Sequence, residues 1–193
     1  MKENKMSEVF TIDCGEIVLR EYSLQDADSI YKIALEEQVT NFLPDWKTSR
    51  KQRHEWVKNY EIPGNQKFLQ EVFEGKVPTG YLRLGIIHKK TDTFIGWCCL
   101  GPKEELSEPN TEIVYSITKE YEGLGFVTLA VQSLIRYIFT KTKIQTINAL
   151  ARIDNIGSVK VIKKCNFTYI ADIEIDNHLF HHFKLTKDSL NLY

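Results

Sequence analysis

The chain has 193 residues, of which 42% are hydrophobic and 26% are charged, and its formal net charge is −1. This composition is ordinary for a globular domain, and it excludes a fibrous repeat, a largely disordered chain and an extended nucleic-acid-binding face, which would need clustered basic residues. No apolar run is long enough to span a membrane and the first ten residues lack a signal-peptide pattern, so a single cytoplasmic domain over residues 1–193 is expected.

The first third of the chain predicts one strand and two helices. EIVLREY (16–22) has the β-branched, alternating character of a strand, and Ser23 with Asp26 forms a capping-box pattern that opens a helix to about Leu35. A proline-containing turn, NFLPDWK, precedes a charged helical stretch over 49–60. Residues 61–80 carry two prolines and three glycines, which predicts a long connection that contains one short helix.

The rest of the chain predicts mainly strands, interrupted by one long helix. The alternation predicts a strand over 111–117, and apolar residues at helical spacing predict an amphipathic helix over 126–142. Further predicted elements are a hairpin of 81–90 with 94–101, a strand over 146–153, a short helix over 158–165, and strands over 167–175 and 178–186. The order predicts an α+β fold, with one mixed, mostly antiparallel sheet flanked by helices on both faces.

Cysteine and histidine residues show no metal-ligand pattern. The four cysteines lack paired metal spacing, and the adjacent pair Cys98 and Cys99 should point to opposite faces of a strand. We interpret Cys14, Cys98, Cys99 and Cys165 as reduced structural thiols. His181 and His182 would likewise face opposite sides of the last strand, and no metal site is expected.

Two glycines, Gly123 and Gly125, stand between the strand 111–117 and the helix from 126. A glycine-bearing loop at a helix N-terminus offers unpaired N–H groups, the positive end of the helix dipole and room for a phosphate oxygen. The spacing fits neither a Walker A nor a Rossmann motif. The alternative is that both glycines only shape a turn.

A second motif strengthens the phosphate interpretation. The stretches YEGLGFVT (121–128) and NIGSVKVIKKCNF (155–167) occur in order, with the predicted long helix between them. They resemble the motifs Y-x-G-x-G-Y-A-T and N-x-x-S-x-x-V-x-x-K-x-G-F of the GNAT acetyltransferase superfamily, in its RimJ/RimL-like branch. EIVLREYSLQDADSIYKIA (16–34) resembles that family's opening strand and helix, so the similarity covers about residues 15–187.

The resemblance implies acetyl-CoA as cosubstrate, with its pyrophosphate at the glycine loop and its pantetheine arm along the strand 111–117. It assigns the cofactor to Val114, Tyr115, Ser116, Ile117, Glu122, Gly123, Leu124, Gly125, Phe126, Val127, Thr128, Asn155 and Ser158. Glu122 and Val127 depart from the family pattern, because an acidic side chain repels pyrophosphate and a smaller residue is usual at the second position.

The resemblance also implies catalytic roles. Glu112 stands where similar enzymes place a carboxylate that accepts the amine proton, and its alternative interpretation is an exposed glutamate at a strand end. Many GNAT enzymes use a tyrosine as the acid toward the leaving thiolate, but Ile162 occupies that position here, so Ser158 becomes the candidate acid. Asn155 and Ser158 also fit the first turn of a helix, and the two roles can coexist. Trp46 borders the acceptor site, and with Glu112 it is the expected substrate contact.

The function implied is transfer of acetyl from acetyl-CoA to a primary amine. The acceptor is either a protein N-terminal amine, as in RimJ/RimL-like enzymes, or a small amine such as an antibiotic or a polyamine. A noncatalytic acyl-CoA sensor stays open because of Ile162. The expected partners include neither nucleic acid nor membrane, and a homodimer is left open.

Overall fold

A computed structural model describes residues 9–190, which form one eight-stranded sheet in the order β1-β2-β3-β4-β5-β6-β8-β7. Every neighbouring pair is antiparallel except β5 with β6, which are parallel. The predicted mixed, mostly antiparallel sheet is therefore confirmed. The strands are β1 (Thr11–Cys14), β2 (Ile17–Glu21), β3 (Leu82–His88), β4 (Thr93–Pro102), β5 (Thr111–Ile117), β6 (Thr146–Arg152), β7 (Thr168–Ile175) and β8 (His178–Thr186).

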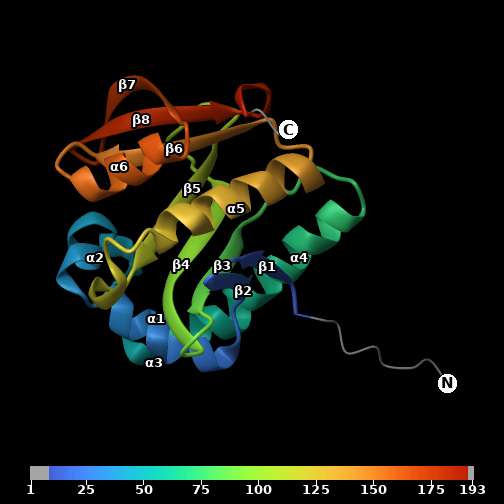
Figure 1. The fold of residues 1–193 in the computed structure, drawn as a ribbon, viewed down its shortest axis with the longest axis vertical. Coiled ribbons are helices and arrows are strands. Elements are labelled where there is room, and N and C mark those ends of the chain that lie inside the picture. The colour runs from blue at the N-terminus through green and yellow to red at the C-terminus, as the bar shows by residue number, and fades with distance from the viewer. Residues whose placement is uncertain (1–8, 191–193) are drawn as a thin grey trace.

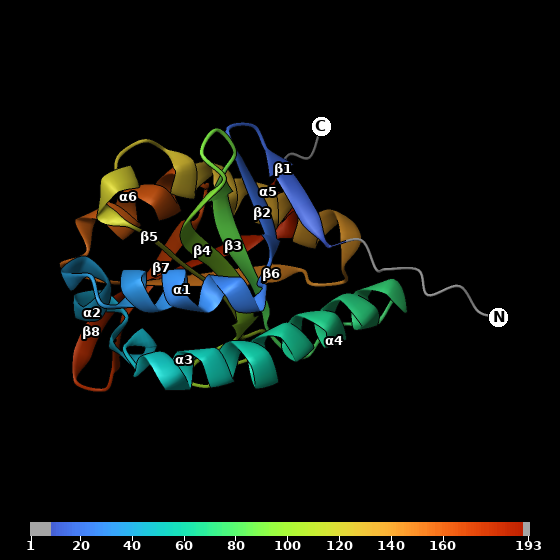
Figure 2. The same cartoon turned by 90° about the horizontal axis from the view of Figure 1, so that it is seen from below.

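Helices cover both faces of the sheet, as predicted. Figure 2 shows α5 and α6 on one side of the strands and α1, α3 and α4 on the other, and Figure 1 shows α5 running across the sheet. The helices are α1 (Ala27–Ala34), α2 (Glu37–Phe42), α3 (Arg50–Trp56), α4 (Ile62–Phe73), α5 (Phe126–Lys141) and α6 (Ile156–Lys164). Over residues 9–190, no helix is long and apolar enough to cross a membrane.

Each face of the sheet has its own hydrophobic cluster. The larger cluster joins the strands to the apolar stripe of α5, which the helical spacing predicted, and contains Val127, Val131, Leu134, Ile135 and Ile138. The smaller cluster joins the opposite face to α1. Cys98 belongs to the first cluster and Cys99 to the second, so adjacent residues of β4 do point to opposite faces.

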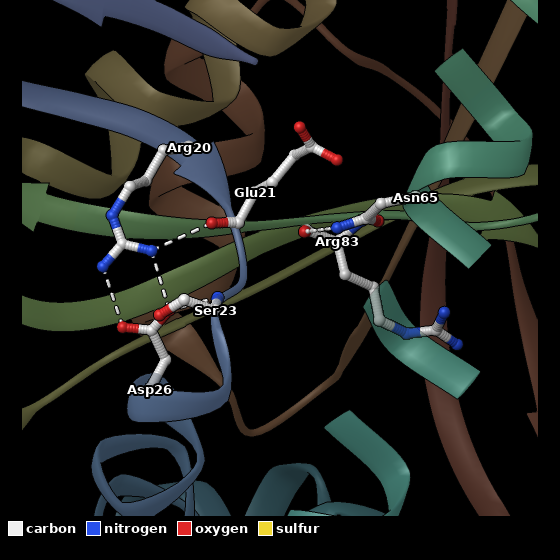
Figure 3. A network of polar contacts seen from close by, with 6 residues as sticks. All are labelled: Arg20, Glu21, Ser23, Asp26, Asn65 and Arg83. Carbon is white, nitrogen blue, oxygen red and sulfur yellow. Dashed lines mark hydrogen bonds and ion pairs between the residues drawn. The ribbon is translucent and has the colours of Figure 1, made fainter. Parts of the chain in front are cut away.

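The connection from β2 to α1 is held by the predicted capping box. The Asp26 carboxylate accepts hydrogen bonds from the Ser23 N–H at 2.6 Å and the Ser23 hydroxyl at 2.8 Å. Arg20 on β2 adds two hydrogen bonds to the same carboxylate, at 2.7 and 2.8 Å. Figure 3 shows this network, which fixes the start of α1 against the sheet.

The prediction for residues 61–80 is wrong over most of its length. Residues Val57–Glu61 form a π-helical segment that continues α3 directly into α4, so the helical course runs from Arg50 to Phe73. Pro63 and Gly64 predicted a break because proline lacks an N–H and clashes with the carbonyl four residues earlier. The carbonyl with which Pro63 would clash lies within the π-helical segment, whose turn is wider than that of an α-helix. Such π segments occur frequently at functional sites.

Two short elements were also missed. Neither β1 nor α2 was predicted, and both are at most six residues long. The segment predicted as a turn, NFLPDWK, contains the end of α2 and a 3-10 turn over Pro44–Trp46. Elements this short carry too few residues for a periodic pattern to be recognised.

Candidate functional site

The strands β5 and β6 separate soon after they meet. Of the described residues, only Glu112 and Asn148 are paired between these strands, although β5 continues to Ile117 and β6 to Arg152. The buried Asn148 side chain donates hydrogen bonds to the carbonyls of Pro109 and Thr111, at 2.8 and 3.1 Å. This anchors the closed end of the gap. Beyond it, the edge of β5 that faces β6 is available to an extended ligand.

The glycine loop opens beside the N-terminus of α5. Gly123 and Gly125 have φ values of 76° and 86°, in the left-handed region that favours glycine, and a Cβ at either position would meet no atom within 4 Å. Gly125 is the N-cap of α5 and no side chain caps the helix. The turn thus requires these glycines, and it leaves open space at a helix end that attracts anions.

The side chains of Glu122 and Val127, which depart from the motif, both lie outside the open space at the glycine loop. The Glu122 side chain is exposed, whereas the Val127 side chain is buried in the large core cluster. An exposed carboxylate is well solvated and is not forced against a phosphate in the loop. The bulk of Val127 is directed into the core, so it does not fill the open space at the glycines.

Glu36, which the sequence analysis missed, fixes the strand end that leads to this loop. Its carboxylate accepts hydrogen bonds from the Thr118 hydroxyl at 2.5 Å and from the Lys119 N–H at 2.8 Å. Glu36 lies between α1 and α2, more than eighty residues earlier in the sequence. No local pattern points to a contact of that separation.

Ser158 lies in the first turn of α6 and reaches β5. Its N–H donates to Asn155 Oδ1 at 3.0 Å, so Asn155 is the N-cap of α6. Its Oγ lies 2.8 Å from the Tyr115 hydroxyl, which also lies 3.1 Å from the Ser158 carbonyl oxygen. Burial raises the pKa of Tyr115, which keeps its hydroxyl protonated. Ile162 is buried in the core, so Ser158 and Tyr115 are the hydroxyl groups that meet here.

A cavity of about 420 Å³ lies on the opposite face of β5. We call it the aromatic cavity because four aromatic side chains line it, namely Trp46, Trp56, Tyr60 and Tyr81. Glu112 and Val114 of β5 also line it, whereas Tyr115 and Ile117 belong to the large cluster on the other face. The predicted alternation along β5 is confirmed.

Burial raises the pKa of Glu112 to about 7. The nearby Lys103 charge and the Leu150 backbone lower this pKa, and the Glu105 charge raises it, but burial is the largest cause. Glu112 is half-buried and lines the cavity, so it is not the freely exposed strand-end glutamate of the alternative interpretation. A carboxyl that is half ionised near neutral pH suits proton transfer.

Trp46 lies in the wall of the aromatic cavity. Its ring stacks on Trp97 with centroids 4.3 Å apart and planes at 9°. Arg53 donates a hydrogen bond to the Trp46 carbonyl at 2.9 Å, and its guanidinium carbon lies 5.2 Å from the ring centroid of Trp46. Trp46 is therefore held rigidly by the small core cluster and by α3.

A buried ion pair completes this wall. Arg53 Nη1 lies 3.0 Å from Glu61 Oε1, and the two residues are 1% and 6% exposed. Arg53 Nε and Glu61 Oε2 have no hydrogen-bond partner in residues 9–190. Neither residue was predicted as part of the site, because the sequence pattern assigns them to separate elements, whereas the π segment joins them in one helical course.

Within the described part of the chain, no group of three or more histidine, cysteine, aspartate or glutamate residues is placed to hold a metal ion.

The candidate site consists of the β5–β6 gap, the glycine loop, the Ser158–Tyr115 contact and the aromatic cavity.

Residues 16–168 match the family model described as "Acetyltransferase (GNAT) domain". A curated relative, "Uncharacterized N-acetyltransferase p20" of Bacillus licheniformis, is 25% identical over 157 residues, which cover 81% of this chain and 82% of the relative. Both comparisons span the glycine loop and β5.

Solved structures share the fold. One is RimL, a ribosomal L7/L12 α-N-protein acetyltransferase in complex with coenzyme A, with a TM-score of 0.71, 16% identity and coverage of 93% of this chain and 99% of RimL. Another is a chimera of the spermidine N-acetyltransferase SpeG from Vibrio cholerae and hSSAT, with a TM-score of 0.68, 16% identity and coverage of 92% and 99%. At these identities the likeness is one of fold.

Proposed function

This chain belongs to the GNAT acetyltransferase family, and on that basis we propose that it transfers an acetyl group from acetyl-CoA to a primary amine held in the aromatic cavity. The observation that carries the proposal is the position of Glu112. This carboxyl, whose pKa is raised to about 7, lines the cavity and is also the last β5 residue paired with β6 before the gap opens. An amine in the cavity and an acyl donor in the gap would meet beside it.

The residues around the gap fit a coenzyme A thioester. The diphosphate would lie at residues 122–128, because the space beside Gly123 and Gly125 is open and the first-turn N–H groups of α5 lack intrahelical partners. The backbone of β5 over residues 114–117 would hold the pantetheine arm by strand-like hydrogen bonds. Acetyl-CoA supplies the activated acetyl group.

Glu112 acts as the general base in this proposal. An alkylammonium ion has a pKa near 10, so it is unreactive at neutral pH until a base takes its proton. Glu112 in its ionised form accepts that proton, directly or through one water molecule.

Ser158 donates a proton to the departing thiolate. Its hydroxyl is on the face of the sheet that carries α5 and α6, and it is hydrogen-bonded to Tyr115, whose hydroxyl stays protonated. The Tyr115 hydroxyl can in turn donate a proton to Ser158. Together the two hydroxyl groups would replace the tyrosine that many family members carry at the position of Ile162.

The pH dependence of kcat/KM tests these roles. The base must be ionised and the acceptor must bind as an ammonium ion, so kcat/KM should fall about tenfold per pH unit as the pH drops below about 7 and should fall again above about pH 10. The Ser158→Ala variant should lower the rate and keep the inflection near 7. The measurement is coenzyme A thiol release at saturating acetyl-CoA. An inflection near 4 to 5, typical of an exposed carboxyl, would contradict the assignment of Glu112.

The cavity limits the acceptor. A volume of about 420 Å³ is that of a small-ligand site, so it accepts a small amine or the first residues of a polypeptide. The RimL structure gives a precedent for a protein N-terminus and the SpeG chimera gives one for spermidine.

A further inference from the structure

Arg83 lines the aromatic cavity, and its guanidinium group has no hydrogen-bonding partner among residues 9–190. It lies on β3 in register with Cys99 of β4, which is in register with Val114 of β5, and all three residues line the cavity. Within residues 9–190, no hydrogen bond or ion pair involves its guanidinium group, whereas Arg53 is engaged by Glu61 and by a carbonyl. Five N–H donors of Arg83 are therefore left for solvent or a ligand.

The backbone of Arg83 is fixed by an unusual contact. Asn65 of α4 is fully buried, and its side chain pairs with both the N–H and the carbonyl of Arg83, each at 2.7 Å. Figure 3 shows this pairing, with the Arg83 side chain leading away from Asn65. The contact ties α4, which directly follows the π segment, to the strand that carries Arg83.

The side chain of Arg83 is also supported. Its guanidinium carbon lies 4.3 Å from the ring centroid of Tyr81, and the Tyr81 hydroxyl donates to the Pro102 carbonyl at 2.7 Å. The Tyr81 ring lies over Gly101, where any Cβ would clash with it. A rigid platform of this kind lowers the entropy that an arginine loses when it binds a ligand.

The charged residues that line the cavity are Arg53, Arg83, Asp45, Glu61 and Glu112. Arg53 is paired with Glu61, whose pKa burial raises even though both arginines oppose that shift, so within residues 9–190 Arg83 is the lining cation without an ion pair. Glu112 lies on the neighbouring row of the same face, with its Cα on the order of 12 Å from that of Arg83 by strand spacing and rise. The cavity thus has a base at one end and a cation at the other, with Trp46, Trp56 and Tyr60 among the lining residues.

We propose that Arg83 binds a carboxylate of the acceptor, so that the substrate is a primary amine that carries a carboxylate several bonds from the amine. This inference rests on the proposed acetyl transfer in the aromatic cavity. The planar guanidinium matches a carboxylate in a two-point hydrogen bond, and the aromatic walls suit the apolar spacer. The carboxylate belongs either to a free amino acid or short peptide, or to an acidic side chain next to a polypeptide N-terminus.

Matched amines test the inference. Wild-type protein should acetylate 6-aminohexanoate with a kcat/KM about ten- to a hundredfold above that of hexylamine, and cadaverine should be poorer than either. Arg83→Gln should reduce the ratio of aminohexanoate to hexylamine to about one, mainly through KM, and Arg83→Lys should restore part of it. Arg136→Gln, which removes an exposed arginine of α5, should leave the ratio unchanged. Hexanoate should inhibit the wild type and not Arg83→Gln.

Peptide pairs separate the two sources of carboxylate. A tripeptide with a free C-terminus should be preferred over its amide if the terminal carboxylate is bound, and an amidated peptide with Asp at position two should be preferred over its Asn counterpart if a side chain is bound. A wild-type ratio near one, or a ratio that Arg83→Gln leaves intact, would overturn the inference while acetyl transfer stands. Absence of amine acetylation together with absence of thermal stabilisation by acetyl-CoA would instead overturn the proposed function, and the inference with it.

Discussion

Replacing Glu112 by Gln should lower kcat for acetyl transfer about 10²- to 10⁴-fold, the range that a positioned general base contributes. Gln keeps the shape and some of the hydrogen bonding of Glu112 but cannot accept the amine proton. The inflection of the pH profile near 7 should disappear with the carboxyl, because burial gives Glu112 that pKa. Single-turnover kinetics with 6-aminohexanoate measures the chemical step without product release.

Two controls test whether the loss of rate is specific to the Glu112 carboxyl. The Glu104→Gln variant changes an exposed residue of the neighbouring loop and should keep the wild-type rate. The affinity of Glu112→Gln for acetyl-CoA, measured by thermal stabilisation, should stay within a few-fold of wild type, because the glycine loop is elsewhere. If Glu112→Gln retains more than about a tenth of the wild-type rate, Glu112 is not the base.

Replacing Arg53 by Met should destabilise the fold by about 3–5 kcal/mol, as expected when one partner of a buried ion pair is removed. The two residues are 1% and 6% exposed, and Arg53 also supports the Trp46 carbonyl. The change would leave Glu61 buried without its partner. Urea unfolding at pH 7.5 measures the free energy of unfolding.

The double variant Arg53→Met/Glu61→Met distinguishes pair loss from lost packing. It should be more stable than Arg53→Met, because no unpaired charge stays buried. Arg50→Met, which breaks an exposed pair with Asp28, should change the unfolding free energy far less. A double variant less stable than either single variant would show that packing, and not the unpaired charge, causes the loss.

The sequence predicted the elements on the β5 and α5 side of the candidate site, which local patterns encode. Alternation predicted a strand with the observed ends of β5, Thr111 and Ile117. The glycine pair and the helical stripe located the start of α5 at Phe126. These predictions are correct because each depends on residues that lie close together in the sequence, within one or two helical turns or strand repeats.

The acceptor side was largely hidden from the sequence. Arg53 and Glu61 belong to one wall only because the π segment carries the helix through Pro63, against the local preference of proline. Arg83 meets Tyr81 through a strand geometry that depends on Gly101. The Tyr115–Ser158 contact joins residues 43 positions apart, and Glu36 meets Thr118 across 82. Tertiary packing decides all of these contacts.

Hydrogen exchange with and without acetyl-CoA tests the central claim, that the gap between β5 and β6 and the glycine loop form the acyl-donor site. Saturating acetyl-CoA should slow exchange of the backbone amides over residues 113–117 and 123–128, because both segments carry N–H groups without intrahelical or β6 partners. Unchanged exchange in both segments, or protection confined to another part of the sheet, would contradict this placement of the donor.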